Sequence, residues 1–418
     1  MSPVTAPSSP AEGAALPPAG LYVHLPFCVA RCPYCDFTVY AGTFARGPKA
    51  RTERLYEAVN RELELRADAL DERFGRRPPL RSLYFGGGTP SLVSAEWFER
   101  LMTTVRRRFG LEPGAEVTLE ANPGSDERGD LSSFAAAGVN RVSFGAQSLT
   151  AAELRRLGRR HSPADVAAAV AEARAAGVAS INVDLLYDLP EQTVTGWEDT
   201  LRAALALRPD HLSLYALTLD DPDAEGLTGE AGDHLPTTPG VRRWREAARL
   251  GQDDDRAADQ YRLATELLAA DGWRGYEISN WAQPGHESRH NLTYWERRPY
   301  EAVGPGAHAF DGRIRRWNAA DLARYIDALL PVEGRAALPP GGSEAISVAT
   351  AAAERAILAL RLDRGVGAVW AAESAASEAF IWARQAGLVE DFDLEGEARV
   401  RLTLRGRLLS NELFQRLL

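Results

Sequence analysis

Residues 22–37 read Tyr22-Val-His-Leu-Pro-Phe-Cys28-Val-Ala-Arg-Cys32-Pro-Tyr34-Cys35-Asp-Phe37 and contain all three cysteines of this 418-residue chain. The thiols are separated by three and two residues and follow a short apolar run that predicts a first strand. Such a cluster cannot form a disulfide framework, and its spacing is typical of cysteines that hold a metal centre. A structural zinc ion, which would need a fourth ligand, and inert buried thiols are the alternatives.

The composition is that of an ordinary globular protein, with 45% apolar and 25% charged residues. Its length predicts two domains. Lys plus Arg number 48 against 58 Asp plus Glu, and a net charge of −10 has the wrong sign for binding nucleic acid. The sequence contains neither a secretory signal nor an apolar run long enough to span a bilayer. We therefore predict a cytoplasmic protein without a nucleic-acid partner.

Short β-branched runs alternate with alanine-rich helical stretches through the first half of the chain, a pattern typical of a parallel α/β sheet. The expected strands are 21–26, 82–85, 116–120, 141–144, 180–186 and 211–216, and the expected helices between them are 51–70, 95–109, 163–176 and 196–207. About six strand–helix units fall short of the eight of a full TIM barrel. The sequence thus predicts an α/β fold with a partial (β/α)6 TIM-type barrel, open at the side.

The alternating pattern ends after Thr218, which we take as the domain boundary. The predicted division is a disordered tail at 1–19, the barrel at 20–219, and a mixed, mainly helical C-terminal domain at 220–418. Residues 220–254 are acidic and rich in Pro and Gly, as in a connection or an insert. Helices are expected at 256–270, 345–362 and 368–386, and a strand at 398–404, which suggests that the chain ends in a winged-helix-like unit without a basic recognition stretch.

Polar or glycine residues mark the ends of four successive predicted strands: Gly86-Gly87-Gly88-Thr89, Glu120, Gln147 and Asp184. Chemistry in α/β barrels lies at this end of the strands, whereas inward barrel positions are otherwise apolar. Glycines let a backbone approach a ligand closely, carboxylates such as Glu120 accept hydrogen bonds from an amine or ribose, and Arg159 suits a carboxylate. A tight turn, helix capping or mutual pairing are the structural alternatives for these residues.

The cysteine loop resembles the radical S-adenosylmethionine (SAM) signature, in which three cysteines hold a [4Fe-4S] cluster and the free iron binds SAM. From about residue 20 to the C-terminus, the sequence is similar to the oxygen-independent coproporphyrinogen III oxidase family. The matching motifs are Tyr22-Val-His-Leu-Pro-Phe-Cys28, Gly86-Gly-Gly-Thr-Pro90, Glu120-Ala-Asn-Pro123, Gly145-Ala-Gln-Ser148, Leu157-Gly-Arg-Arg-His161 and Tyr276-Glu-Ile-Ser-Asn280. The resemblance implies that Cys28, Cys32 and Cys35 ligate the cluster and that Tyr22, Tyr34, Gly87, Gly88, Thr89, Glu120, Gln147, Arg159 and Asp184 contact SAM.

Two features favour the heme-chaperone branch of this family over its oxidases. The oxidases have a fourth cysteine two residues after the third, where this chain has Phe37. The block His290-Asn-Leu-Thr-Tyr294-Trp295, followed by Gly304-Pro-Gly-Ala-His308, resembles the region thought to bind heme in the chaperones. A histidine can be an axial heme ligand and aromatic rings can stack on a porphyrin, although a core histidine is the alternative for His290.

The resemblance therefore implies a chaperone that binds heme, SAM and a [4Fe-4S] cluster and passes heme to cytochromes. It further implies an electron donor, contact with membranes only through acceptor proteins, and no coproporphyrinogen III dehydrogenase activity. Radical decarboxylation of coproporphyrinogen III and a non-catalytic scaffold with a structural metal are the competing functions.

One motif departs from the family. The usual Tyr-Gly-Leu-Pro-Gly-Gln turn is here Tyr187-Asp188-Leu-Pro-Glu191-Gln192. The replacement of two glycines predicts an altered turn at the floor of the SAM pocket.

Overall fold

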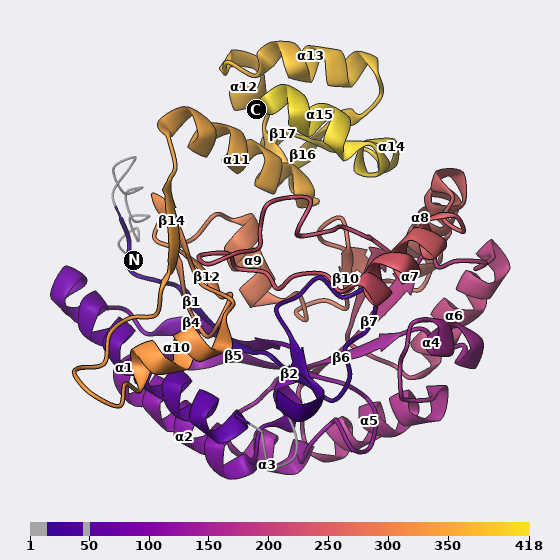
Figure 1. The fold of residues 1–418 in the computed structure, drawn as a ribbon. Coiled ribbons are helices and arrows are strands. Elements are labelled where there is room, and N and C mark those ends of the chain that lie inside the picture. Colours follow the sequence, from indigo (N-terminus) through magenta and orange to yellow (C-terminus); the bar gives the residue numbers. More distant parts are fainter. Residues whose placement is uncertain (1–14, 45–50) are drawn as a thin grey trace, which may run out of the picture.

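A 12-stranded sheet forms the centre of the computed structural model, which describes residues 15–44 and 51–418 (Figure 1). Six neighbouring strands from the first half of the chain run parallel in chain order: β1 (Gly20–Leu25), β4 (Leu80–Gly87), β5 (Leu111–Ala121), β6 (Arg141–Gln147), β7 (Ser180–Tyr187) and β8 (His211–Ala216). Each coincides with a predicted strand. Most of the predicted tail lies outside the described residues.

Helices cover the outer side of these strands, as Figure 1 shows. They are α1 (Thr52–Phe74), α2 (Ala95–Arg108), α3 (Leu131–Ala136), α4 (Ala151–Arg156), α5 (Pro163–Ala175) and α6 (Val194–Ala206). Buried rings such as Phe85, Phe98 and Phe134 join strands and helices in one apolar core. The predicted α/β fold with parallel strands and outer helices is confirmed.

Short strands from the second half of the chain extend this sheet at both edges. Beside β1 lie β11 (Tyr300–Val303), which is parallel to it, and then the antiparallel β12 (His308–Phe310), β13 (Ile314–Asn318) and β14 (Gly341–Ala345). Beside β8 lie the antiparallel β10 (Asn280–Ala282) and β9 (Arg274–Gly275). Strands from both predicted domains therefore share one sheet, and the division at 219/220 stays a prediction.

The last 70 or so residues form a separate small sheet with its own core, at the top of Figure 1. The sheet order is β15-β17-β16, with β15 (Val366–Gly367), β16 (Val389–Leu394) and β17 (Glu397–Leu402). The helices are α11 (Val348–Arg361), α12 (Ala368–Glu373), α13 (Ser377–Gln385), α14 (Leu404–Leu408) and α15 (Ser410–Leu417). The expected single helix at 368–386 is thus two helices, interrupted between Glu373 and Ser377.

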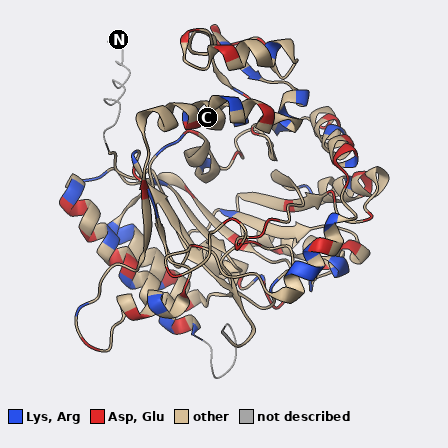
Figure 2. Ribbon diagram, turned by 45° about the horizontal axis from the view of Figure 1, so that its top comes forward, with Lys and Arg blue, Asp and Glu red and all other residues tan. Residues whose placement is uncertain are grey.

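The remaining helices are α7 (Pro239–Arg249), α8 (Asp254–Ala270), α9 (Arg289–Trp295) and α10 (Leu322–Leu329). None of the helices within the described residues is long and apolar enough to cross a membrane. Figure 2 shows acidic and basic residues interspersed along the outer helices. On this surface Arg108 of α2, for example, pairs with Glu64 and Asp68 of α1.

Candidate functional site

Two adjoining pockets lie over the carboxyl ends of the parallel strands. The smaller has a volume of about 140 Å³ and lies between the cysteine loop and the strand ends. It is lined by most of the predicted site residues: Cys28, Cys32, Tyr34, Cys35, Gly87, Gly88, Glu120, Gln147, Arg159 and Asp184. The sheet topology therefore brings together side chains that are far apart in the sequence: Cys28 and Asp184 are separated by 156 positions.

The three thiols share this pocket, and each sulfur has a hydrogen-bond donor nearby. Thr89 Oγ1 lies 3.5 Å from the sulfur of Cys28, and Arg159 Nη1 lies 3.4 Å from that of Cys32. The backbone N–H of Phe37 donates to Cys35. Burial raises the pKa of Cys28 to about 11 and that of Cys35 to about 12, so these thiols lose their protons to the solvent only when a strongly cationic centre binds the sulfurs.

The chemistry of this donor set bears on the kind of metal centre it could hold. Within the described chain, no three His, Cys, Asp or Glu side chains are placed to hold a single metal ion. Three cysteine thiols with hydrogen-bond donors beside their sulfurs fit an iron–sulfur cluster, in which each thiolate binds a different iron and hydrogen bonds to the ligand sulfurs tune the cluster.

Arg159 follows α4 and its guanidinium is buried in the pocket wall. Its Nη2 donates to Asn122 Oδ1 at 2.5 Å and to the carbonyl oxygen of Gly145 at 2.6 Å. Its Nε is buried without a hydrogen-bond partner. A buried guanidinium with an unused donor fits a ligand carboxylate. Asn122 was not predicted, although it lies in the quoted Glu120-Ala-Asn-Pro123 motif.

Glu120 ends β5 with both carboxylate oxygens engaged. Oε1 accepts from the Tyr84 hydroxyl at 2.8 Å, and Oε2 accepts from the Gly87 N–H at 2.9 Å. Burial raises the pKa of Glu120 to about 7, and the nearby Asp184 adds to the shift. The carboxyl group of Glu120 is therefore ready to lose its proton and become charged when a cationic ligand amine binds beside it.

Gly87 at the end of β4 and the following Gly88 are required by packing. Gly87 has φ +117°, and a Cβ there would lie 2.6 Å from the ring of His24. A Cβ on Gly88 would lie 2.7 Å from the carbonyl oxygen of Phe27. The strand that leads into the cysteine loop can pass β4 only because these side chains are absent.

Asp184 and Gln147 complete the pocket floor. Asp184 accepts from Asn182 Nδ2 at 2.6 Å and Ser143 Oγ at 3.1 Å, and burial raises its pKa. Gln147 has φ +67° where the register between β6 and β7 shifts. A left-handed backbone at a non-glycine residue is strained, and such strain is common at functional sites.

Three predicted site residues do not line this pocket. Tyr22 is hydrogen-bonded to His24 at 3.0 Å and stacks on Tyr84. Thr89 is buried behind Cys28, where it contacts the sulfur and not the cavity. The third is His290, on α9.

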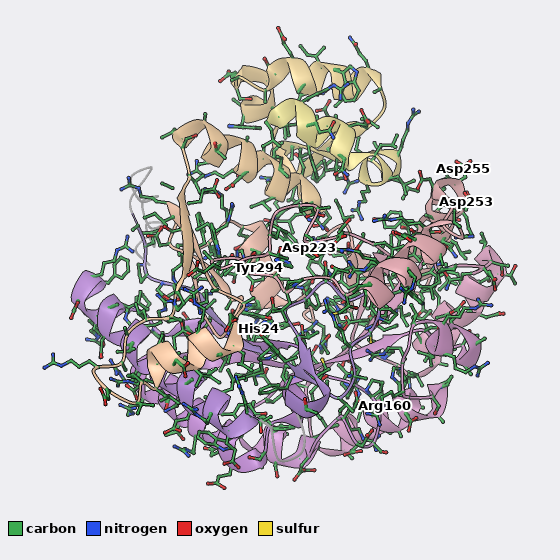
Figure 3. All side chains as sticks on the ribbon, viewed as in Figure 1. His24, Arg160, Asp223, Asp253, Asp255 and Tyr294 are labelled. Carbon is green, nitrogen blue, oxygen red and sulfur yellow. The ribbon has the colours of Figure 1, made fainter. Side chains whose placement is uncertain are left out.

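His290 is a buried core residue in this structure, with 1% of its surface exposed. Its Nδ1 lies 2.9 Å from Ser82 Oγ and its Nε2 lies 2.8 Å from the hydroxyl of Tyr294, which is labelled in Figure 3. Its ring stacks on Tyr84 at 5.0 Å, and burial lowers its pKa to about 3. Because both ring nitrogens are occupied, the geometry favours the core alternative over heme ligation.

The larger pocket, of about 530 Å³, extends from the cysteine loop into the barrel interior. Its walls include Ser143, Asn182 and Ser213, which lie on three neighbouring strands. Small polar residues at these positions leave a space that apolar side chains would fill in an ordinary barrel. The sequence analysis did not predict this pocket. The polar residues within otherwise apolar strands were the feature that could have indicated it.

The turn after β7 has a left-handed backbone at the two residues that stand where the family has glycines. Asp188 has φ +55° and Glu191 has φ +63°. Asp188 forms a buried ion pair with Arg256, and Glu191 pairs with Arg156. Both residues thus adopt a backbone conformation that favours glycine, and their ion pairs tie the turn to α4 and α8; an alteration relative to the family's turn stays a prediction.

The two donors to Glu120 predict a measurable titration. We expect Glu120 to titrate near pH 7 in the free protein, and Tyr84→Phe to raise its pKa further because a hydrogen bond to the charged form is lost. Carboxyl carbon NMR checks both values. A titration near the ordinary value of 4.5, or a lower pKa in Tyr84→Phe, would contradict this geometry.

Comparisons with known proteins identify the family and agree with the fold. The model of the radical SAM superfamily matches residues 22–204. Heme chaperone HemW of Mycobacterium tuberculosis (strain H37Rv) is 38% identical over 403 residues, 96% of this chain and 95% of the relative. Heme chaperone HemW of Escherichia coli (strain K12) is 37% identical over 305 residues, 72% of this chain and 73% of the relative.

A solved structure shows the same architecture. Coproporphyrinogen III oxidase (HemN) from Escherichia coli superposes with a TM-score of 0.75 at 21% identity, over 96% of this chain and 90% of that one. At this identity the likeness concerns the fold alone. The extended similarity to HemW, together with the superfamily match over the barrel, shows that the chain belongs to the HemW family of radical SAM proteins.

Proposed function

We propose that this protein is a heme chaperone that binds heme and holds a SAM-coordinated [4Fe-4S] cluster. The observation that carries the proposal is the cysteine loop itself, with three thiols in one pocket and Phe37 at the position of the oxidases' fourth cysteine. Phe37 lines both pockets and is 59% exposed. The naming of both HemW relatives as heme chaperones supports the same function.

In this proposal Cys28, Cys32 and Cys35 ligate the cluster, and the strand ends bind SAM. Glu120 accepts hydrogen bonds from the SAM amine, and the unused Nε of Arg159 faces a carboxylate. Asp184 accepts from a ribose hydroxyl. The cluster, when bound, supplies the single electron that cleaves SAM.

Radical decarboxylation of coproporphyrinogen III is the competing function. The HemN-like fold and the larger pocket beside the cysteine loop are compatible with a substrate. The missing fourth cysteine opposes it. As a chaperone in the cytoplasm, the protein would receive electrons from a donor and pass heme to cytochromes, reaching membranes only through those acceptors.

The experiment that tests the proposal follows heme and porphyrinogen in one anaerobically reconstituted sample. We expect added heme to produce the absorption band of a protein-bound heme, and coproporphyrinogen III to remain unconverted in the presence of SAM and dithionite. Conversion to protoporphyrinogen would identify an oxidase that works without the fourth cysteine. A sample that shows no heme binding and no conversion would favour the non-catalytic scaffold.

His290→Ala separates the two roles considered for this histidine. Because both ring nitrogens are engaged in the core, we expect the variant to unfold at lower urea concentration and to bind heme with unchanged affinity. Asn291→Ala, which alters the next residue of α9 at the wall of the larger pocket, is the control. Loss of the heme band with unchanged unfolding would make His290 a heme ligand.

A further inference from the structure

Residues 220–254, which the sequence left without a role, lie against the cysteine loop. Their helix α7 begins after the capping residue Thr238 and is polar on most of its surface. Only Arg245 and Ala248 of this helix are buried, and Arg245 is 3% exposed. Figure 1 shows the indigo N-terminal segment reaching this helix.

Arg245 donates hydrogen bonds to three main-chain carbonyl groups. Its Nε lies 3.2 Å from the oxygen of Pro33, and its Nη2 lies 3.1 Å from that of Cys35. Its Nη1 donates to the oxygen of Asp220. Two of these acceptors belong to the loop that carries the thiols. A planar guanidinium holds both in one fixed geometry, which a flexible ammonium group does not do.

The charge of Arg245 has no close carboxylate partner among the described residues. On the same helix, Arg242 pairs with Asp221 and Asp223. Burial lowers the pKa of Arg245 and the nearby Arg31 adds to this effect, whereas Asp36, Asp221 and Cys35, as a thiolate, favour its charge only through space. A buried charge is costly unless it is compensated, and anionic thiolates around a cluster would supply that compensation.

Two further contacts join this segment to the loop. Tyr34, between the second and third cysteines, packs against the same apolar cluster as Trp244 of α7, and that cluster includes Ala248 of α7. Beyond the third cysteine, Thr38 Oγ1 donates to the carbonyl oxygen of Asp233 at 2.5 Å. The segment therefore holds the loop by its backbone, by a ring that lines both pockets, and at its far end.

We propose that residues 220–254 clamp the cysteine loop and that Arg245 is the positioning residue, which fixes the main chain between Cys32 and Cys35 and places a positive charge beside the cluster. This inference rests on the proposed cluster. A positive charge stabilises the more negative, reduced form of a cluster, so Arg245 raises its one-electron reduction potential.

The test compares Arg245→Met with Arg249→Met. Arg249 is on the same helix and also donates to a main-chain carbonyl, but to that of Leu219, away from the loop. Relative to this control, we expect Arg245→Met to retain less iron after reconstitution and to be reduced only at a more negative potential. In the metal-free proteins, trypsin should cleave after Arg31 several-fold faster in Arg245→Met, as followed by mass spectrometry.

Arg245→Lys separates the effect of the positive charge from that of the guanidinium's fixed hydrogen bonds. It also replaces Arg245→Met in the test if the methionine variant does not fold. The lysine keeps the charge but has no planar fork to hold the two carbonyls in one fixed geometry, so we expect a potential near that of the wild type together with faster cleavage after Arg31. Identical iron content, potential and cleavage in the Arg245 and Arg249 variants would overturn the clamp. A wild-type protein that takes up no cluster would instead overturn the proposed function, and the cleavage comparison would still test the clamp.

Discussion

The close passage of the chain over the end of β4 is the constraint on which the site depends. Phe27 and His24 approach Gly88 and Gly87 so closely that neither glycine admits a Cβ. This contact places the following cysteine loop over the carboxyl ends of the strands. The same glycine turn gives the Gly87 N–H to Glu120, so one piece of backbone packing sets both the position of the thiols and the orientation of the facing carboxylate.

Buried charge is then distributed around the loop from two sides. Arg159 contacts the sulfur of Cys32 from the barrel, and Arg245 binds the loop backbone from α7. In the barrel floor, Glu120 and Asp184 are carboxyl groups whose pKa values burial raises. Cations close to the thiols and carboxyl groups opposite them suit an anionic cluster with a ligand that carries both an amine and a carboxylate.

The sequence was sufficient for the parallel strands and for most of the pocket, because both follow from strong local patterns. Apolar runs of the strands, and polar residues where they end, identify the barrel and its functional edge without tertiary information. By contrast, β9 to β12 are two to four residues long and have no alternation to detect. The predicted role of His290 depended on a motif, whereas its actual environment depends on Ser82 and Tyr84 of a distant strand. Arg245 was equally invisible, since its importance comes from carbonyl groups over 200 positions earlier.

The central claim is that three thiols hold a cluster whose open iron faces SAM. Electron paramagnetic resonance of the dithionite-reduced protein, recorded with and without SAM, tests this most directly. The account predicts a cluster signal that changes when SAM is added, because SAM binds an iron that no protein side chain ligates. A signal that SAM leaves unchanged, or no cluster signal at all, would contradict it.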